Sequence, residues 1–424
     1  MRTRDEPGVR YDGRVDPPAE LFYVLAAALL LPAFDAFGRW RRAAAYRPGR
    51  VAGRRLRRVL VLIPARAEGS RMLPLCSDLK REAREAEVRL DLLVVLDGED
   101  PAAEAALAVD EVPCLVKAPA GPSKGTALAF ATESLLASRP ELLTAADVVM
   151  VFDADMRLEE GFFSGLLIPE GTEAFQLPVR PAGVPAPGPA RVEAFSLAVA
   201  TRVEDLARDA EALPVRLRGK AMGFSPRAWL EGPAAAHRTT AEDSEATLRL
   251  LSEGVRIRAL PSPFAFDEAG GTAGAMARPR ARWFGGHLKL LAVGAPHLTR
   301  LAVLSPRAAF VLAADLWLRP RALVLFLLLL VALGADATLV VLSLTGRAAG
   351  GRALLPALLA SVVSKAGLVF EGLAGLAARG VLGYPAEIPP IAPGDVVAYL
   401  VLWMRALGRA VRAPGVWHRA RPEA

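Results

Sequence analysis

Cysteine is almost absent from this chain. Cys76 and Cys114 are the two cysteines among its 424 residues, and they do not form a C-x-x-C pair. The sequence therefore contains no disulfide framework and no thiolate zinc site, and we expect reduced thiols in a cytosolic domain. A cleavable signal peptide is also lacking, because residues 1–19 are mixed in charge and no small-residue cleavage pattern follows the first apolar run. We interpret that run as a retained membrane anchor.

Acidic residues are missing where the basic ones gather. The net charge is +7 and 53% of the residues are hydrophobic, a combination that indicates separate apolar and charged regions. Residues 39–58 carry nine Arg and no acid, directly after an apolar run. This favours membrane lipid, and no nucleic acid, as a partner. Because positive flanks stay on the cytoplasmic side, we expect an integral plasma-membrane protein whose following domain is cytosolic; the alternative is a solvated basic linker.

Three apolar segments, 20–38, 321–346 and 353–378, are long enough to cross a bilayer. Residues 396–411 are less apolar and form either an interfacial helix or a third helix of the C-terminal region. In order, the chain is predicted to comprise a tail (1–19), a transmembrane helix (20–38), a basic juxtamembrane linker (39–58), a cytosolic α/β domain (59–290), an interfacial segment (291–320), a C-terminal membrane region (321–412) and a second tail (413–424).

Two opposite charges interrupt the C-terminal crossings. Asp336 and Lys365 lie at similar distances from residues 347–352, the predicted turn of a helical hairpin. A lone charge at that depth costs at least ~2.5–3.5 kcal/mol, so such charges face inward and pair. We therefore predict an ion pair between them. The alternatives are that each charge faces a hydrated cavity, or that Glu371 competes for the lysine.

The stretch between the apolar ends is typical of a parallel α/β domain. Short runs rich in Val, Leu and Ile at 59–65, 90–97, 114–119 and 147–155 alternate with helical segments, which indicates a mostly parallel sheet with flanking helices. Ligands bind such sheets beyond the carboxyl ends of the strands. The Pro/Gly-rich residues 178–191 are predicted to form a surface loop.

The strongest single signal for chemistry is an Asp-x-Asp that ends an apolar strand. Asp153 and Asp155 close the run VVMVFDAD at 148–155. Carboxylates at a sheet rim suit a hard divalent cation, Mg²⁺ or Mn²⁺, whose remaining ligands a nucleotide diphosphate would supply. Surface acidic pairs are common, so the motif alone is weak.

A second acidic pair begins a later helix. Glu242 and Asp243 open the stretch EDSEATLRLLSEG. Sugar transfer with inversion needs a base that removes the proton of the acceptor hydroxyl, and a carboxylate remote from the metal pair suits that role. Acids also favour helix N-termini for electrostatic reasons, so helix capping is the alternative.

Other candidate residues follow the first two strands or precede the C-terminal membrane region. Each has an ordinary explanation: a helix cap for the acids, no role for a lone lysine, and a membrane-surface anchor for the Arg-Trp pair. They are Pro64, Arg66 and Glu68 after the first strand, Asp97 after the second, Lys124 in a Pro/Gly-rich loop, Gly219, and Arg282 with Trp283.

The order of these signals resembles that of membrane-bound family 2 glycosyltransferases of the cellulose synthase-like and N-acetylglucosaminyltransferase-like kinds. The family carries I-P-A-x-N-E, an Asp-ended strand, G-K-x-x-A-L-N, D-A-D, T-E-D and Q-x-x-R-W in that order. The matching segments here are IPARAE (63–68), VVLDGED (94–100), SKGTALA (123–129), FDAD (152–155), AED (241–243), PRARW (279–283), and also LRGKAMGF (217–224) and GVWHRAR (415–421).

The resemblance implies a GT-A-like fold and a role for each matched residue. Asp97 and Glu68 would contact the nucleoside of a nucleotide sugar, with Pro64, Arg66 and Lys124 on the same donor side. The diphosphate and metal would be held by Asp153 and Asp155, Asp243 beside Glu242 would be the base, and Gly219, Arg282 and Trp283 would line the acceptor or diphosphate side.

Several motif positions depart from the family pattern. The most consequential is Pro279, which replaces the Gln of a motif that marks processive polymer synthases, so processivity is not implied. Leu96 before Asp97 replaces a double Asp, which leaves open which of the two positions carries the nucleoside contact. The others are Ala67 and Ala129 in place of Asn, Ser123 in place of Gly and Ala241 in place of Thr.

The sequence thus predicts an inverting, metal-dependent transfer of a sugar, from a UDP-sugar on family grounds, to a lipid-linked or polysaccharide acceptor at the cytosolic membrane face. Two alternatives stay open. One is a nucleotidyltransferase of similar fold, and the other is a non-catalytic membrane scaffold that retains the fold.

Overall fold

The structure is a computed structural model that describes residues 17–47, 49, 52–267, 273–318, 321–345, 354–382 and 390–412. The chain forms two compact units, one of residues 1–37 with 324–372 and one of residues 38–323 with 373–424. The predicted tail 413–424, most of the tail 1–19, the hairpin turn 347–352 and the GVWHRAR segment lie outside the described residues.

The larger unit is built on a seven-stranded sheet of order β3-β2-β1-β4-β8-β6-β9. All four apolar runs predicted as strands are confirmed, and β1 to β4 are mutually parallel. The antiparallel β8 pairs with β4 and with β6, which is parallel to β9. The strands are β1 (Arg58–Ala65), β2 (Arg89–Asp97), β3 (Cys114–Lys117), β4 (Val148–Val151), β6 (Ala174–Gln176), β8 (Met222–Phe224) and β9 (Ile257–Ala259).

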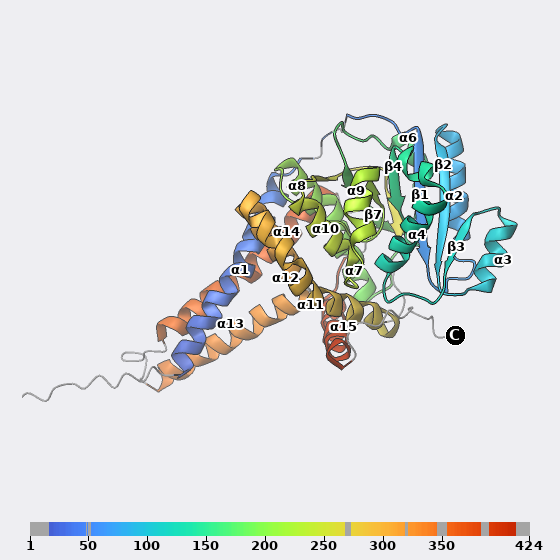
Figure 1. Cartoon of the computed structure of the whole chain (residues 1–424). Helices are drawn as coiled ribbons and strands as arrows, with labels where there is room; N and C mark the ends of the chain where they lie inside the picture. Colours follow the sequence, from blue (N-terminus) through green and yellow to red (C-terminus); the bar gives the residue numbers. More distant parts are fainter. Residues whose placement is uncertain are drawn as a thin grey trace, which may run out of the picture. The chain divides into compact units, whose positions relative to one another are not determined.

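Strand β1 is apolar after Arg58 because both faces of the sheet are covered. Val61 and Ile63 pack in one core cluster, whereas Leu60 and Leu62 pack in the other, as the two-residue repeat of a strand requires. The first cluster includes side chains from α2 (Leu73–Glu85), α3 (Pro101–Val109) and α6 (Phe162–Gly165). The second includes α4 (Lys124–Ser138), α5 (Pro140–Thr144), α9 (Pro226–Glu231) and α10 (Glu242–Ser252) (Figure 1).

A small second sheet corrects one prediction. Residues 178–191, predicted to be a surface loop, instead contain β7 (Val179–Pro181), which pairs with β10 (Ala265–Asp267), itself paired with β5 (Met156–Leu158). Val179 is fully buried. A strand of three residues is too short to show an alternating pattern between prolines and glycines, and this is why composition favoured a loop.

The other helical segments of the larger unit come after β7 in the chain. They are α7 (Pro189–Val199), η1 (Ala200–Glu204), α8 (Asp205–Ala210), η2 (Pro233–Ala235), α11 (Ala273–Leu304), α12 (Pro306–Trp317) and α15 (Pro393–Arg412). The predicted boundary at residue 290 falls inside α11. In α15, Leu402 packs with Ala190 of α7 and Met276 of α11.

Part of the basic run is buried in ion pairs, and is not a solvated linker. Arg39 lies 2.9 Å from Glu204, and both side chains are 5% exposed. Arg321 lies 2.8 Å from the same carboxylate and 3.4 Å from Asp315. Removing one member of such a buried set leaves a charge without its partner, at a cost of several kcal/mol.

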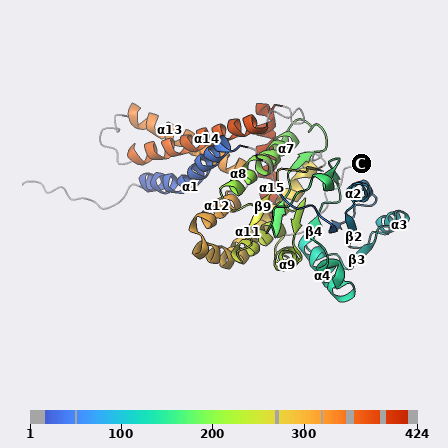
Figure 2. The same cartoon turned by 90° about the horizontal axis from the view of Figure 1, so that it is seen from above.

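The smaller unit consists of apolar helical segments. Helices α1 (Pro17–Ala45), α13 (Arg321–Leu344) and α14 (Leu354–Leu382) contribute to it, and Figure 2 shows them running alongside one another. Leu29, Leu328 and Ala360, one from each helix, share an apolar cluster. The candidate membrane spans are Tyr23–Ala45, Leu323–Leu344 and Leu354–Leu382, so α1 continues as a helix through the first arginines after the predicted anchor.

The predicted pair of charges in the C-terminal hairpin is confirmed. Lys365 Nζ lies 2.8 Å from Asp336 Oδ1, and Ser361, which sequence reasoning missed, donates its hydroxyl to the same oxygen at 2.7 Å. The side chains of Lys365 and Asp336 are 54% and 39% exposed on this unit. The expectation that they face inward is therefore wrong: they satisfy each other at the surface of the helix pair.

Candidate active site

The topology of the sheet brings the candidate segments to one edge. The parallel β1, β2 and β4 end at the same edge, and β8, which is antiparallel to β4, begins there, with Met222 opposite Val151. The residues after β1, β2 and β4 and those before β8 therefore meet. These segments contain most of the predicted site residues.

The Asp-x-Asp pair lies just beyond β4, which ends at Val151, earlier than predicted. Asp153 accepts a hydrogen bond from the Lys124 ammonium. Burial acts to raise the pKa of Asp153, but Lys124 and Lys220 outweigh it and hold that pKa below its ordinary value. Asp155 has the opposite balance: burial, then Asp153 and Asp267, raise its pKa to about 7. A negative charge on Asp155 is thus incompletely compensated by the protein's own cations.

Lys124 connects the two acidic pairs. It is the first residue of α4, whose N-terminus is fixed by a reciprocal capping box between Ser123 and Thr126. Its ammonium bridges Asp153 and the carbonyl oxygen of Gly219. Lys124 therefore spans from the end of β4 to the segment before β8.

Gly125 lets the start of α4 approach the second acidic pair. A Cβ at this position would lie 2.3 Å from the Ala236 carbonyl oxygen and 3.0 Å from Glu242 Cβ. A Cβ cannot be accommodated 2.3 Å from a backbone oxygen, so a side chain at position 125 would push the start of α4 away from Ala236 and Glu242.

Glu242 and Asp243 are the first two residues of α10. Asp243 Oδ1 accepts a hydrogen bond from the Ser244 amide at 2.7 Å, so part of the predicted capping alternative holds. Its Oδ2 instead lies 3.7 Å from Arg216 and stays available. Asp243 can therefore cap the first turn and still present one oxygen to a substrate.

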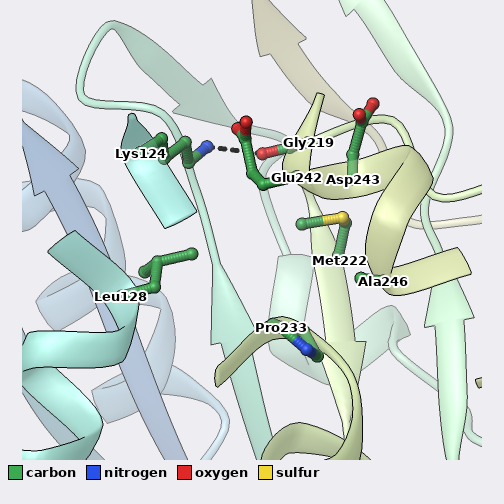
Figure 3. A pocket seen from close by; sticks show the side chains of 8 residues that line it. All are labelled: Lys124, Leu128, Gly219, Met222, Pro233, Glu242, Asp243 and Ala246. Atoms are coloured by element: carbon green, nitrogen blue, oxygen red, sulfur yellow. Dashed lines mark hydrogen bonds between the residues drawn. The ribbon is translucent and has the colours of Figure 1, made fainter. Parts of the chain in front are cut away.

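Both carboxylates border one pocket, drawn in Figure 3. In that view they lie on the same side, and the Lys124 ammonium extends past Glu242 toward the Gly219 carbonyl. Burial, and then Asp243, raise the pKa of Glu242 to about 7, against the effect of Lys124 and Arg282. The pocket is lined by Lys124, Leu128, Gly219, Met222, Pro233, Glu242, Asp243 and Ala246.

Gly219 brings its segment close to Asp243 without a steric clash. It has φ +80°, which favours glycine, and a Cβ built on it would lie 3.8 Å from Asp243 Oδ2. Gln176 at the end of β6 braces this segment: its Nε2 donates to the Lys220 carbonyl at 2.9 Å, and its Oε1 accepts from the Arg218 amide at 2.8 Å. The backbone before β8 is therefore held in place.

On the other side of the edge, Asp97 ends β2 with a buried carboxylate. Its Oδ1 accepts from the Gly121 amide at 2.7 Å, whereas its buried Oδ2 has no hydrogen-bond partner within the part of the chain that the structure describes. Arg66 lies 3.7 Å from that Oδ2 and donates to the Gly121 carbonyl at 3.0 Å. An unsatisfied buried acceptor is costly, so Asp97 suits a ligand that donates hydrogen bonds.

The remaining residues near β1 and β2 have mixed roles. Pro64 is buried within β1. Glu68 lies 3.6 Å from Arg71 and contributes to the negative field at Asp155. Asp100 is structural, as the capping alternative states, because it accepts from the Ala103 amide at the start of α3.

Arg282, on α11, lies within electrostatic range of both acidic pairs, whereas its neighbour Trp283 is 38% exposed. Burial lowers the pKa of Arg282, and the charges of Glu242, Asp153 and Asp243 act against that effect. Helix α11 lies close to the start of α10: a Cβ on Gly286 would come within 2.6 Å of Thr240 Oγ1. The predicted arginine thus belongs to the site, and membrane anchoring does not explain it.

Sequence reasoning missed four residues of the site. Lys220 and Asp267 form an ion pair beside the Asp-x-Asp, Arg216 lies next to Asp243, and Gln176 braces the segment before β8. Two of them, Lys220 and Arg216, belong to or adjoin LRGKAMGF, from which only Gly219 was singled out. For Asp267 and Gln176, which end strands of three residues, no sequence signal was available.

The donor set is consistent with a divalent cation that takes further ligands from a bound molecule. Within the described ranges, no group of three or more His, Cys, Asp or Glu residues could hold a metal ion. Two neighbouring carboxylates with excess negative charge are present at Asp153 and Asp155. The protein would therefore supply a part of the ligand shell, and oxygen ligands of another origin would complete it.

No known family model and no curated protein matches the chain. One matching solved structure is the mannosyltransferase PcManGT from Pyrobaculum calidifontis in complex with GDP-Man and Mn²⁺. The match has 17% sequence identity and a TM-score of 0.49, and it covers 85% of this chain and 99% of that chain. Mannosyl-3-phosphoglycerate synthase from Rubrobacter xylanophilus matches at 14% identity with a TM-score of 0.37, over 58% of this chain and 76% of that chain. Glucosyl-3-phosphoglycerate synthase from Mycobacterium tuberculosis, in complex with Mn²⁺, UDP and glucosyl-3-phosphoglycerate, matches at 17% identity with a TM-score of 0.34. This match covers 59% of this chain and 86% of that chain.

Proposed function

We propose that this chain transfers a sugar from a nucleotide sugar to an acceptor at the cytosolic face of a membrane, with inversion at the anomeric carbon. The observation that carries the proposal is the meeting of two acidic pairs at one sheet edge, joined by Lys124. Asp153 and Asp155 offer charge for a cation, while Glu242 and Asp243 border a pocket in which one carboxylate oxygen stays available.

The donor would lie across the carboxyl ends of β1, β2 and β4. Asp97 Oδ2, buried and without a hydrogen bond in the described structure, would accept from the nucleoside. Arg66, Glu68 and the end of β1 at Pro64 border the same region. The diphosphate would then reach Lys124 and Arg282, whose positive charges stabilise the leaving group as its bond to the sugar breaks.

A divalent cation, Mg²⁺ or Mn²⁺, held by Asp155 and Asp153, would supply further neutralisation of the departing diphosphate. The acceptor would enter the pocket lined by Gly219 and Met222. Asp243 would take the proton from the acceptor hydroxyl as its oxygen forms the bond to the anomeric carbon, opposite the breaking bond to the diphosphate. Glu242, which shares the pocket, would hold Lys124 and Arg282 toward the donor.

We infer that the acceptor is lipid-linked or a polysaccharide. Within the described residues, three helices are long and apolar enough to cross a membrane. They support this reading, since a soluble acceptor would not require them. UDP-sugars are the first donors to test, on the sequence resemblance.

The decisive experiment is a donor panel. Membranes or purified full-length chain, incubated with UDP- and GDP-sugars and Mn²⁺, should release nucleoside diphosphate, and EDTA should abolish the release. Release of pyrophosphate from a sugar phosphate and a nucleoside triphosphate would instead identify a nucleotidyltransferase. Binding without turnover of any donor would favour a non-catalytic scaffold.

The cytosolic orientation has its own test. Ser70 is exposed in the loop after β1, so a cysteine there should react with an impermeant maleimide in inverted vesicles but not in intact cells. Background is low because burial raises the pKa of Cys76 to about 11, and Cys114 is replaced by Ser as a control. Efficient labelling from outside intact cells would overturn the orientation.

A further inference from the structure

Lys220 is a partly buried cation near the acidic pair that the proposed mechanism assigns to the metal. Its ammonium lies 2.5 Å from Asp267 Oδ2, and both side chains are 20% exposed. The charges of Asp267, Asp153 and Asp155 outweigh burial and raise the pKa of Lys220. The lysine is thus charged, and its partner Asp267 lies opposite Met156, the residue that follows Asp155.

The backbone of Lys220 has little freedom. Gln176 Nε2 donates to its carbonyl oxygen at 2.9 Å, and the preceding Arg218 is bound to Asp205 by two hydrogen bonds of 2.7 and 2.8 Å. Two residues after Lys220, Met222 begins β8 and pairs with Val151 of β4. What can move is the side chain, whose length lets the ammonium pivot between neighbouring oxygens.

The charges around the Asp-x-Asp explain why a second lysine is present. Three carboxylates, of Asp153, Asp267 and Glu68, add their negative charge to that of Asp155 there. Lys124 binds Asp153, and Lys220 pairs with Asp267, which lies opposite Met156, the residue after Asp155, in the small sheet. A divalent cation that binds Asp155 would be repelled by the nearby Lys220 ammonium.

We propose that Lys220 compensates the acidic pair until the cation arrives, and then turns to the donor's diphosphate as a phosphate-binding residue. The inference rests on the proposed function. It assigns Lys220 two opposite effects: it weakens binding of the cation alone and strengthens binding of the cation together with a nucleoside diphosphate.

The two effects can be measured without turnover. Full-length wild type and Lys220→Met, in detergent, are titrated with Mn²⁺ and free Mn²⁺ is followed by its electron paramagnetic resonance signal. UDP and GDP are then titrated at saturating Mn²⁺ by calorimetry. Loss of the competing charge should tighten Mn²⁺ binding roughly threefold to tenfold, whereas loss of a charge-assisted hydrogen bond should weaken diphosphate binding roughly tenfold or more.

Matched variants separate charge from folding. Lys220→Arg keeps the positive charge and should stay close to wild type in both titrations. Lys80→Met removes a lysine that donates to the Asp110 carbonyl, away from the site, and should change neither. Should Lys220→Met unfold because Asp267 loses its partner, the double variant Lys220→Met/Asp267→Asn, which leaves a neutral pair, should show the same weak diphosphate binding.

The outcomes are distinct. Tighter Mn²⁺ with weaker diphosphate in Lys220→Met supports the inference. Unchanged values, or a loss of Mn²⁺ affinity, in a folded variant whose wild type binds both ligands would overturn this inference alone. A wild-type chain that binds neither Mn²⁺ nor a nucleoside diphosphate would overturn it together with the proposed function.

Discussion

Two regions of the molecule use charge in opposite ways. At the edge of the sheet where β4 ends, acids are placed side by side: Asp153 next to Asp155, and Glu242 next to Asp243. In the helical unit, Asp336 stands 2.8 Å from an opposite charge, Lys365, and accepts a further hydrogen bond from Ser361. Like charges gathered in a partly buried place lower stability and are typical of functional sites, whereas an opposite pair on apolar helices satisfies itself.

This difference predicts different effects when an acid is neutralised in each region, and both effects can be measured. Neutralising one acid of a like-charged pair should damage chemistry or ligand binding and leave the fold intact or more stable. Neutralising one member of the Asp336–Lys365 pair should lower stability and affect activity only through it.

The largest effect is expected for Asp243→Asn. If this carboxylate is the base, transfer should fall by ~10²–10⁴, while nucleotide binding and thermal stability stay near wild type. Turnover of the chosen nucleotide sugar, nucleotide affinity and the melting temperature are measured on the same preparation. Turnover equal to that of the wild type would show that Asp243 is not the base. A large loss of stability would show that its role is structural.

Asp155→Asn should come next. The variant loses a carboxylate offered to the cation, so we expect Mn²⁺-dependent nucleotide affinity to fall about 10–100-fold, by analogy with changes around metal ligands. Affinity without Mn²⁺ should hardly change, and calorimetry with and without EDTA checks both. Equal losses under the two conditions would mean that Asp155 serves the nucleotide directly.

Glu242→Gln tests the cost of crowding like charges. The pKa of Glu242 is raised to about 7 from an ordinary 4.5, so the unfolded chain releases this proton at lower pH than the folded one. Stability is then lost as the pH rises from about 4.5 to 7 and stays lower above it. The Gln variant escapes this loss and should gain about 1–3 kcal/mol relative to wild type at pH 8, with little gain at pH 4.5. The melting temperatures of both proteins are measured across this range, and a gain that did not grow with pH would contradict the idea.

The smallest effect belongs to the charged pair in the hairpin. Asp336→Ala and Lys365→Ala should each destabilise the full-length chain, and the double change should cost less than the sum, by about 0.5–2 kcal/mol. Ser361→Ala offers a neutral comparison on the same oxygen. Additive losses in the double-mutant cycle would show that proximity of these residues carries no coupling.

Sequence reasoning succeeded where a pattern was long or a charge was out of place. The parallel strands were predictable because β1, β2 and β4 are continuous apolar runs, and the hairpin pair because two opposite charges interrupt apolar helices at matching depth. Strands of three residues, such as β7 with Val179, could not be predicted, since their register is fixed by partners far along the chain.

The site shows the same limit. Asp153, Asp243 and Lys124 were found because each closes or opens a recognisable element. Lys220 and Asp267 were not, because their relation is a contact between the start of β8 and the end of β10, which only the folded sheet creates. The exposure of Asp336 was also unpredictable, as periodicity places a residue on a helix but does not tell which neighbours cover it.

The glycines at 125 and 286 have a consequence for how such a site can change over time. One closes α4 and the other closes α11 onto the same short stretch around Glu242, through backbone contacts that leave no room for a side chain. The position of the acidic pair is thereby set from outside its own motif. The side chain at position 241 takes no part in either glycine contact, so its identity does not set where the two carboxylates lie. A side chain added at position 125 or 286 would displace them, although neither glycine belongs to the acidic motif.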